Sequence, residues 1–202
     1  MTQVKMCGLR RMEDIEAVNR LMPEYVGFIF APASRRFVSP EEAAALRQAL
    51  LPGIRAVGVF VDEDAGSVAR LLAEGVIDIA QLHGNEDGAY IARLKSLTGK
   101  PVIRAFRIKD AEDLRAAEAS AADMVLLDAG AGDGKTFDWS LLSSVSRPYF
   151  LAGGLTPENA AEAVKRFRPF AVDVSSGIET DGFKDCNKMR AFMRAVREGD
   201  SE

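Results

Sequence analysis

The regular alternation of short apolar runs with segments of helical period constrains the fold of this chain more than any other feature. Several of the runs are continuously apolar, which is typical of parallel strands that are covered on both faces. Consecutive parallel strands need crossover connections, and strand and helix alternate here in units of about 25 residues. The eight runs are Gln3–Met6, Tyr25–Phe30, Ile54–Val61, Ile77–Ala80, Pro101–Phe106, Asp123–Leu127, Pro148–Ala152 and Phe170–Val174.

The segments between the runs carry signals for helix starts and stops. Ser39-Pro40-Glu41-Glu42 combines an N-cap, a proline at the first helical position and a capping box, and Thr156-Pro157 repeats the cap and the proline. Gly75 and Gly99 are placed as helix stops. Further helices are predicted at about Met12–Leu21, Asp64–Glu74, Glu86–Leu97, Ala111–Ala121, Asp138–Val145 and Lys184–Glu198.

These elements predict an α/β protein, a single-domain (β/α)8 TIM barrel over residues 1–202. The alternative is an open doubly wound sheet, in which the first and eighth strands do not meet.

Composition excludes several classes of protein. A hydrophobic content of 48% with 28% charged residues is that of a globular chain. The net charge of -4 and the lack of any lysine or arginine run disfavour a nucleic-acid partner. The chain has no apolar stretch of membrane-spanning length and no signal-peptide pattern at its start, so we expect no membrane partner and a cytoplasmic location. Two cysteines and a single histidine argue against a disulfide framework and a metal centre.

In a barrel, the residues that follow the strands share one mouth, where the chemistry of such proteins is found. Cys7 and Gly8 come directly after the first run. Because strand residues alternate between faces, Lys5 and Cys7 point the same way. A free cysteine is most often a small buried hydrophobe, so a chemical role for Cys7 depends on what the other strand ends supply.

Two sets of small residues follow the last two strands. Gly153-Gly154-Leu155 follows the seventh run, and Ser175-Ser176-Gly177 follows the eighth. Glycines let the backbone approach an anion closely, and barrels commonly hold phosphate in the loops after strands seven and eight. Each set alone is explained by a tight turn. Together, on adjacent strands, they predict a phosphate site.

Charged residues also follow the strands. Asp128 comes after the apolar stretch Met124–Leu127, where it can serve as an acid or pair with Lys5, Arg36 or a backbone amide, and the sequence leaves that choice open. The fork of Arg36 suits a carboxylate, although an arginine in a loop is more often solvated.

Three further polar residues are candidates for the lining of a substrate site. Asp173 lies in the eighth run, and pairing with Lys5 across a closed barrel is its simpler explanation. Gln81 and His83 follow the fourth run, where His83 has the ordinary alternative of a loop histidine with satisfied hydrogen bonds. The glycine-rich stretch from Ala129 to Lys135 follows the sixth run.

Taken together, these motifs resemble the phosphoribosylanthranilate isomerases of tryptophan biosynthesis, and the resemblance runs from the first strand to the last helix. Members of that family convert N-(5'-phosphoribosyl)anthranilate to 1-(2-carboxyphenylamino)-1-deoxyribulose 5-phosphate by an Amadori rearrangement. The resemblance implies no metal and no cofactor, and this small molecule as the substrate. We expect a monomer or homodimer, because the sequence does not fix the oligomeric state. The motifs that carry it are Lys5-Met-Cys-Gly8, Ser34-Arg-Arg36, Gln81-Leu-His-Gly84, Leu127-Asp128-Ala129, Phe137-Asp138-Trp139, Leu151-Ala-Gly-Gly-Leu155 and Asp173-Val-Ser-Ser-Gly-Ile-Glu179.

Carried over by position, the resemblance implies that Cys7 is the general base and Asp128 the general acid, and that Arg36 holds the anthranilate carboxylate. It further implies that Gln81, His83 and Asp173 line the substrate site. The phosphate would be bound by Gly153, Gly154, Leu155, Ser176 and Gly177.

The sequence departs from the family pattern in two places. Met6 stands where isoleucine is more usual, which concerns packing. The stretch Asp181-Gly-Phe-Lys184 lacks the usual proline, which leaves open whether this loop closes over the substrate.

Two other functions share part of this pattern. The related histidine-pathway isomerase resembles a duplicated half-barrel with an aspartate where Cys7 stands, so the thiol and the lack of a second phosphate motif disfavour it. A non-catalytic barrel that binds sugar phosphates would keep the glycine and serine loops alone. The presence of both Cys7 and Asp128 argues against that alternative.

Overall fold

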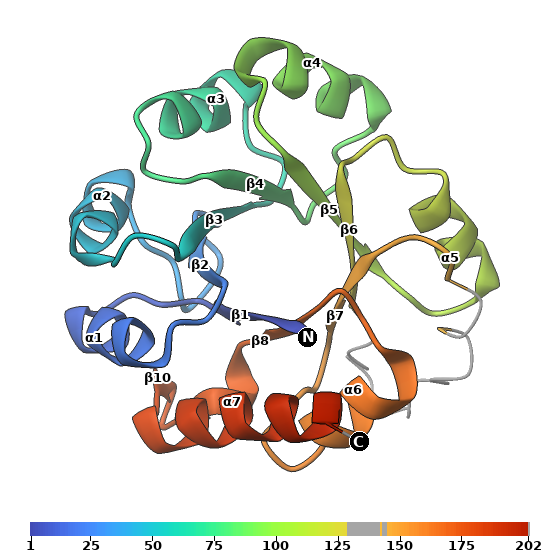
Figure 1. Cartoon of the computed structure of the whole chain (residues 1–202). Helices are drawn as coiled ribbons and strands as arrows, with labels where there is room; N and C mark the ends of the chain where they lie inside the picture. Colours follow the sequence, from blue (N-terminus) through green and yellow to red (C-terminus); the bar gives the residue numbers. More distant parts are fainter. Residues whose placement is uncertain (129–141, 143–144, 202) are drawn as a thin grey trace.

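The computed structural model describes residues 1–128, 142 and 145–201. Within these residues, eight parallel strands follow one another in chain order, and β8 pairs with β1 to close a barrel (Figure 1). The predicted (β/α)8 barrel is confirmed, and the alternative of an open sheet is wrong. The strands are β1 (Gln3–Cys7), β2 (Tyr25–Ile29), β3 (Arg55–Phe60), β4 (Ile79–Leu82), β5 (Val102–Arg107), β6 (Met124–Asp128), β7 (Tyr149–Ala152) and β8 (Ala171–Val174).

Helices surround the barrel on the outside (Figure 1). They are α1 (Met12–Leu21), α2 (Pro40–Ala49), α3 (Ala65–Ala73), α4 (Gly88–Thr98), α5 (Ala111–Glu118), α6 (Ala160–Phe167) and α7 (Cys186–Ser201). The capping box at Ser39 and Glu42 forms as predicted, and Gly99 ends α4 in a left-handed conformation. The helix predicted at Asp138–Val145 lies outside the described residues, apart from residues 142 and 145.

Several predicted boundaries differ from the structure. For example, α5 ends at Glu118 rather than at about Ala121, and α7 runs to Ser201 rather than to about Glu198. Two other differences have a local cause. The fourth strand is Ile79–Leu82, two residues later than expected, because Val76 and Ile77 end the α3 connection with backbone bonds to Leu71. Helix α6 begins at Ala160 rather than just after Thr156. There the Asn159 side chain accepts a hydrogen bond from the Thr156 amide at 2.8 Å, which stabilises a turn before the helix.

The core has two parts, one on each face of the strands. One cluster includes Tyr25, Val57, Ile79, Leu126 and Phe150, which lie inside the barrel. The larger cluster lies between the strands and the outer helices. Burial of apolar area on both faces is the main stabilising contribution in such a fold.

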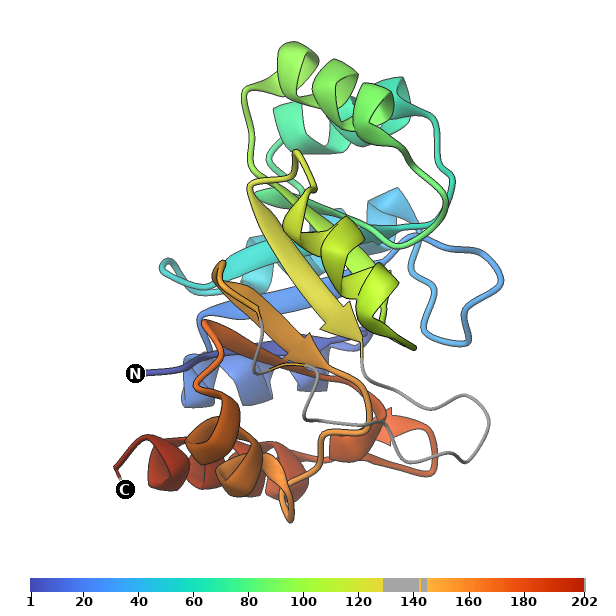
Figure 2. The same ribbon diagram turned by 90° about the vertical axis from the view of Figure 1, so that its right-hand side faces the viewer.

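The two ends of the barrel differ in what they carry. In Figure 2 strands β6 and β7 point to the right, whereas both chain termini lie on the left. The carboxyl ends of the strands, and the hairpin formed by β9 (Glu179–Thr180) and β10 (Phe183–Lys184), therefore lie at the end opposite the termini. This end is where a TIM barrel places its chemistry.

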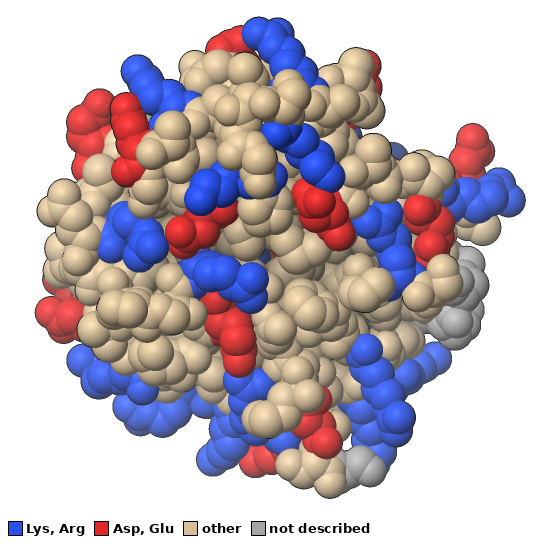
Figure 3. All heavy atoms as spheres, turned by 45° about the horizontal axis from the view of Figure 1, so that its top comes forward, with Lys and Arg blue, Asp and Glu red and all other residues tan. Residues whose placement is uncertain are grey.

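The outer surface carries charges of both signs. On the face in Figure 3 lysine and arginine side chains lie beside aspartate and glutamate side chains. Oppositely charged side chains also form ion pairs between neighbouring segments, such as Lys95 with Asp123 at 2.7 Å. Among the described helices, none combines the length and the apolar character that a membrane crossing requires.

Candidate active site

A pocket of about 420 Å³ opens at the carboxyl ends of the strands. It brings together ten of the eleven residues that the sequence placed in a site, from six strands or the loops after them. Gly177 is the exception. The lining residues are Cys7, Ile29, Arg36, Val59, Gln81, His83, Leu126, Asp128, Ala152, Gly153, Gly154, Leu155, Asp173, Ser175 and Ser176.

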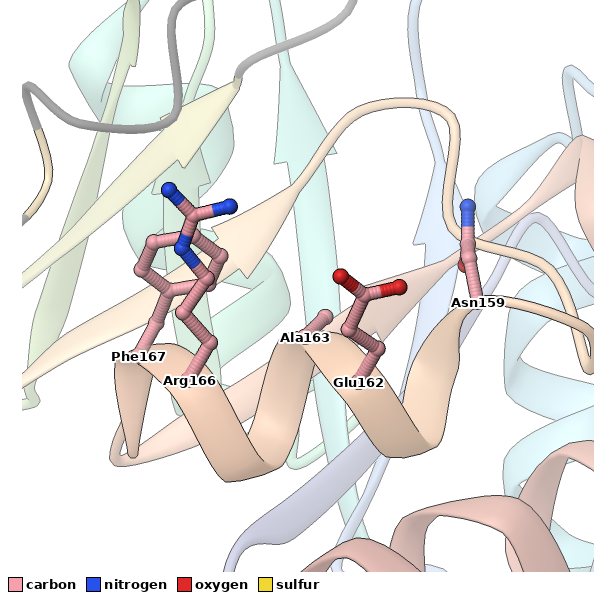
Figure 4. Close-up of a pocket in the computed structure, with 5 residues that line it drawn as sticks. All are labelled: Asn159, Glu162, Ala163, Arg166 and Phe167. Atoms are coloured by element: carbon pink, nitrogen blue, oxygen red, sulfur yellow. The ribbon is translucent and has the colours of Figure 1, made fainter.

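A second hollow, of about 140 Å³, lies along the outer helix α6. The side chains of Asn159, Glu162, Ala163, Arg166 and Phe167 line it, and all come from one helix and its N-cap (Figure 4). It contains none of the strand-end residues. The pocket in the barrel mouth is therefore the candidate active site.

Cys7 is the last residue of β1, and its side chain points into the barrel. Its register partner on β2 is Gly27, where an added methyl group would lie 2.6 Å from the Cys7 Sγ. Gly8 adopts a φ of 80°, and a methyl group there would lie 2.5 Å from the Cδ of Arg36. The two glycines thus make room for the thiol and for the arginine. Gly27 was not among the predicted site residues.

The surroundings of Cys7 affect its protonation. Burial raises the pKa of the thiol above its ordinary value, and the charge of Asp173 acts in the same direction. The positive charges of Lys5 and Lys184 oppose this rise. In the ligand-free protein, Cys7 is therefore a neutral thiol near neutral pH.

Lys5 lies two residues before Cys7 on β1 and is fully buried. Its Nζ donates to Asp173 Oδ1 at 2.9 Å, which is the pairing that the closed barrel predicted. Burial alone would lower the pKa of Lys5, but the neighbouring Asp173 and Cys7 outweigh it and raise that pKa. Asp173 lines the pocket as expected, with Lys5 as its partner.

Arg36 enters the pocket from the loop after β2 and is held by Glu179. Two hydrogen bonds join them, from Nε to Oε1 at 2.6 Å and from Nη2 to Oε2 at 2.8 Å. Lys184 Nζ donates to the same carboxylate at 2.8 Å, and the more exposed Arg35 approaches it at 3.2 Å. Burial opposes ionisation of Glu179, but the bonds from Arg36 and Lys184 prevail and lower its pKa to about 2.

Glu179 and Lys184 were missed as site residues. Glu179 stood in the quoted motif after Ser-Ser-Gly-Ile, yet nothing in a single sequence assigns it to Arg36, because that contact joins residues 143 positions apart. The sequence signal that Glu179 does carry is that a charged residue directly follows the apolar Ile178.

The other side of the pocket carries Asp128 at the end of β6. His83 Nε2 lies 3.9 Å from Asp128 Oδ2, and Gln81 Nε2 lies 3.4 Å from His83 Nδ1. Burial lowers the pKa of His83, against the opposing charge of Asp128, so the imidazole is neutral at pH 7. The Oε1 atom of the buried Gln81 has no hydrogen-bond partner among the described residues.

The loops after β7 and β8 form the remaining wall of the pocket. Gly153 and Gly154 both have positive φ, of 94° and 68°, which glycine adopts without strain. Asn159 Nδ2 donates to the Gly154 carbonyl at 3.0 Å and so fixes this turn.

Gly177 lies in the short 3₁₀ helix Ser176–Ile178 and does not line the pocket. A side chain there would collide with the Leu155 carbonyl oxygen. Gly177 thus lets the loop after β8 pack against the loop after β7. The glycine-rich stretch from Ala129 to Lys135 lies outside the described residues.

The closed barrel, with a thiol, a carboxylate and an arginine at its strand ends, defines the class of this protein as a TIM-barrel enzyme. Residues 4–195 match the family model described as N-(5'phosphoribosyl)anthranilate (PRA) isomerase. The chain belongs to this family and is an isomerase of tryptophan biosynthesis.

Similar proteins agree over the full length of the chain. An N-(5'-phosphoribosyl)anthranilate isomerase of Acetivibrio thermocellus is 46% identical, covering 99% of this chain and 98% of the relative. The crystal structure of phosphoribosyl anthranilate isomerase from Thermotoga maritima is 35% identical with a TM-score of 0.90, covering 98% of this chain and 99% of the other. A phosphoribosyl anthranilate isomerase in complex with reduced 1-(o-carboxyphenylamino)-1-deoxyribulose 5-phosphate is 34% identical with a TM-score of 0.88, at the same coverage.

Proposed function

We propose that this enzyme rearranges N-(5'-phosphoribosyl)anthranilate with Cys7 as general base and Asp128 as general acid. The observation that supports these roles most is that one pocket holds both groups, from β1 and β6, together with Arg36 and the two small-residue loops. The ligand of the similar solved structure, a reduced aminoketose phosphate with a carboxyphenyl group, has parts that match these features.

In the first step Asp128 gives its proton to the furanose ring oxygen, the bond from that oxygen to C1' breaks, and a protonated Schiff base forms. The Cys7 thiol, which is neutral in the ligand-free protein, first loses its proton to solvent. The resulting thiolate takes the C2' proton, and the electron pair of that C–H bond forms the enolamine. Loss of the enol proton and protonation at C1' give the aminoketose. Asp128 is left without its proton and regains one from solvent, and Cys7 ends as the neutral thiol from which it began.

The substrate is held at its two charged ends. Arg36 binds the carboxylate of the anthranilate ring, for which a planar guanidinium is suited. The backbone around Gly153, Gly154 and Leu155, and Ser176 with the adjoining Gly177, supplies neutral donors to the phosphate. Gln81, His83 and Asp173 lie between these ends and line the sugar.

The direct test follows the fluorescence of phosphoribosylanthranilate, which is lost when the substrate is consumed. The purified protein is expected to consume it at a rate proportional to enzyme concentration, without added metal or cofactor.

The Asp128→Asn variant keeps the shape of the side chain but cannot supply the ring-opening proton, so kcat should fall by roughly 10²–10⁴-fold. The acid role of Asp128 is wrong if this variant, shown by circular dichroism to be folded, turns over at the parental rate.

A further inference from the structure

Lys184 is a buried lysine beside the candidate active site to which the proposed mechanism gives no role. It ends β10 with a side chain that is 2% exposed, and it is not among the described residues that line the pocket. So little exposed surface leaves no room for contact with a substrate. Its Nζ donates to Glu179 Oε1 at 2.8 Å, and Glu179 binds Arg36 at two points. Any effect of Lys184 on a substrate therefore passes through this carboxylate.

The hydrogen bonds of Lys184 are those of an ammonium. Besides Glu179 Oε1, its Nζ donates to the Ser175 carbonyl at 2.9 Å and to Ser175 Oγ at 3.4 Å. The Ser175 hydroxyl donates its own proton to the Cys7 carbonyl at 3.0 Å, so its oxygen is an acceptor toward Lys184. Burial lowers the pKa of Lys184, and the bond to Glu179 opposes this effect. Because only the protonated amine has three N–H donors, these three acceptors indicate the charged form.

The guanidinium of Arg36 has one edge for the protein and another for a ligand. Its Nε and Nη2 bond the two carboxylate oxygens of Glu179 at 2.6 and 2.8 Å. In the part of the chain that the structure describes, its Nη1 has no hydrogen-bond partner, and Arg36 lines the pocket. A carboxylate that binds Arg36 from the pocket therefore uses Nη1 and has the carboxylate of Glu179 on the neighbouring edge.

The net charge of this group determines how strongly a carboxylate is attracted. Arg36 and Glu179 alone form a neutral pair, which would attract an incoming carboxylate through the guanidinium and repel it through Glu179. Lys184 adds a buried positive charge to the same carboxylate and so leaves the three groups with a net positive charge. Arg35 also approaches Glu179, at 3.2 Å, but its side chain is 66% exposed, so water screens its charge.

We propose that Lys184 is a positioning residue that sets the preference of the site for a substrate whose ring carries a carboxylate. It offsets the negative charge of Glu179, so that Glu179 orients Arg36 without cancelling the attraction of Arg36 for the ligand. This inference rests on the proposed binding of the anthranilate carboxylate by Arg36. It assigns to the β9–β10 hairpin the discrimination between aminoketose phosphates with and without that carboxylate.

The test compares two ligands by titration calorimetry. One is reduced 1-(o-carboxyphenylamino)-1-deoxyribulose 5-phosphate, and the other is the same compound without the carboxyl group. The parent should bind the first ligand more tightly. In Lys184→Met the affinity for the first ligand should fall by roughly tenfold or more, while the affinity for the second should stay within about twofold of the parent.

Lys188→Met is the matched control for the loss of a lysine from this hairpin region. Lys188 Nζ donates to the backbone carbonyl of Glu179 at 2.6 Å rather than to its carboxylate. Its removal leaves the pairing of Glu179 with Arg36 and Lys184 in place, so both ligands should bind as they do to the parent.

A double variant separates the effect of charge from that of shape. Glu179→Gln added to Lys184→Met removes the negative charge together with the positive one, and Arg36 again supplies a net positive charge. The affinity for the carboxylate ligand should recover to within about threefold of the parent. A purely structural role for Lys184 predicts a further loss instead. The double variant buries no unpaired charge, so it decides the question if Lys184→Met does not fold.

An equal loss for the two ligands in Lys184→Met, or no loss for either, would overturn the inference. A double variant that binds the carboxylate ligand about tenfold more weakly than the parent would do the same. A parent protein that does not prefer the carboxylate ligand would refute the role of Arg36 as well, so the failure of the proposed function is distinguishable from that of the inference alone.

Discussion

The guanidinium of Arg36 and the carboxylate of Glu179 form a bidentate pair, with donor–acceptor distances of 2.6 and 2.8 Å. This pair joins the loop after β2 to the β9–β10 hairpin and fixes the plane of the guanidinium at the pocket. The hairpin is itself held on its far side, where Arg11 Nη2 donates to the Lys184 carbonyl at 2.9 Å. The orientation of Arg36 therefore depends on three loops.

Replacement of Arg36 by lysine should weaken substrate binding although the charge is kept. An ammonium cannot bond Glu179 at two points and present a planar edge to a carboxylate, so the loss should be on the order of 1–3 kcal/mol, measured as a rise in KM. Arg35→Lys, at the neighbouring and more exposed position, is the matched control and should behave like the parent. Kinetics of Arg36→Lys within twofold of the parent would remove Arg36 from the site.

Ionisation of Glu179 should make the free energy of unfolding depend on pH. Its pKa is about 2 in the folded protein, below the ordinary value of 4.5, so its contribution to stability is complete above about pH 4.5 and is lost as the pH falls toward 2. Glu179→Gln should lower the free energy of unfolding on the order of 3 kcal/mol at pH 7, and by much less at pH 2.

Urea unfolding at several pH values measures this dependence. Glu16→Gln, at an exposed position of α1, is the control for the loss of a carboxylate. If the difference in the free energy of unfolding between Glu179→Gln and the parent is the same at pH 7 and at pH 2, the low pKa of Glu179 does not stabilise the fold.

Removal of the Cys7 thiol should affect turnover more than stability. Cys7→Ala is expected to lower kcat by roughly 10²–10⁴-fold while product binding stays nearly intact. Cys7→Ser should rescue little, because a hydroxyl is a far poorer base than a thiolate. Melting temperature and single-turnover rate are measured on the same preparations. A packing role predicts the reverse, with a lower melting temperature and near-normal turnover.

A negative charge at Gly154 should block the phosphate. The space next to this residue is open, because an added Cβ has no neighbour within 4 Å. Gly154→Asp should therefore fold and raise KM strongly by repelling the anion. Gly154→Asn is the matched control, since asparagine has nearly the same shape, tolerates the left-handed backbone and carries no charge. Equal phosphate affinity in the two variants would place the phosphate site elsewhere.

Gln81 should show opposite effects on stability and activity. Its buried Oε1 lacks a partner among the described residues, and an unsatisfied acceptor costs free energy. Gln81→Met fills the same volume and should raise the free energy of unfolding by about 1 kcal/mol. If Oε1 accepts a hydroxyl of the sugar, KM should rise in the same variant. A loss of stability in Gln81→Met would show that Oε1 is satisfied in solution.

Much of the fold was readable from sequence because parallel strands buried on both faces leave continuous apolar runs. Eight such runs with helices between them favour a barrel over an open sheet, and the pairing of β8 with β1 in the structure decides between the two. The ends of helices and strands were harder to predict where a side-chain hydrogen bond stabilises a local turn. Thr156-Pro157 has the pattern of a helix start, but the Asn159 side chain bonds back to Thr156 and delays α6 until Ala160.

Site residues were predictable where their place at the end of a strand alone determines that they face the barrel mouth. Residues such as Cys7 and Asp128 end strands, so a barrel must bring them to one mouth. Contacts between distant loops were not predictable, because no local pattern records them. The pairing of Glu179 with Arg36 and the fit of the Cys7 sulfur over Gly27 depend on how three-dimensional neighbours pack.

Closure of the barrel joins Lys5 to Asp173, which are 168 positions apart. A nascent chain that emerges from the ribosome carries Lys5 from the start but lacks its counter-ion until almost the whole sequence has been made. An incomplete barrel would have to bury an uncompensated ammonium, which is strongly unfavourable. Early strands are thus discouraged from closing on themselves, and catalytic competence arrives only with the last strand.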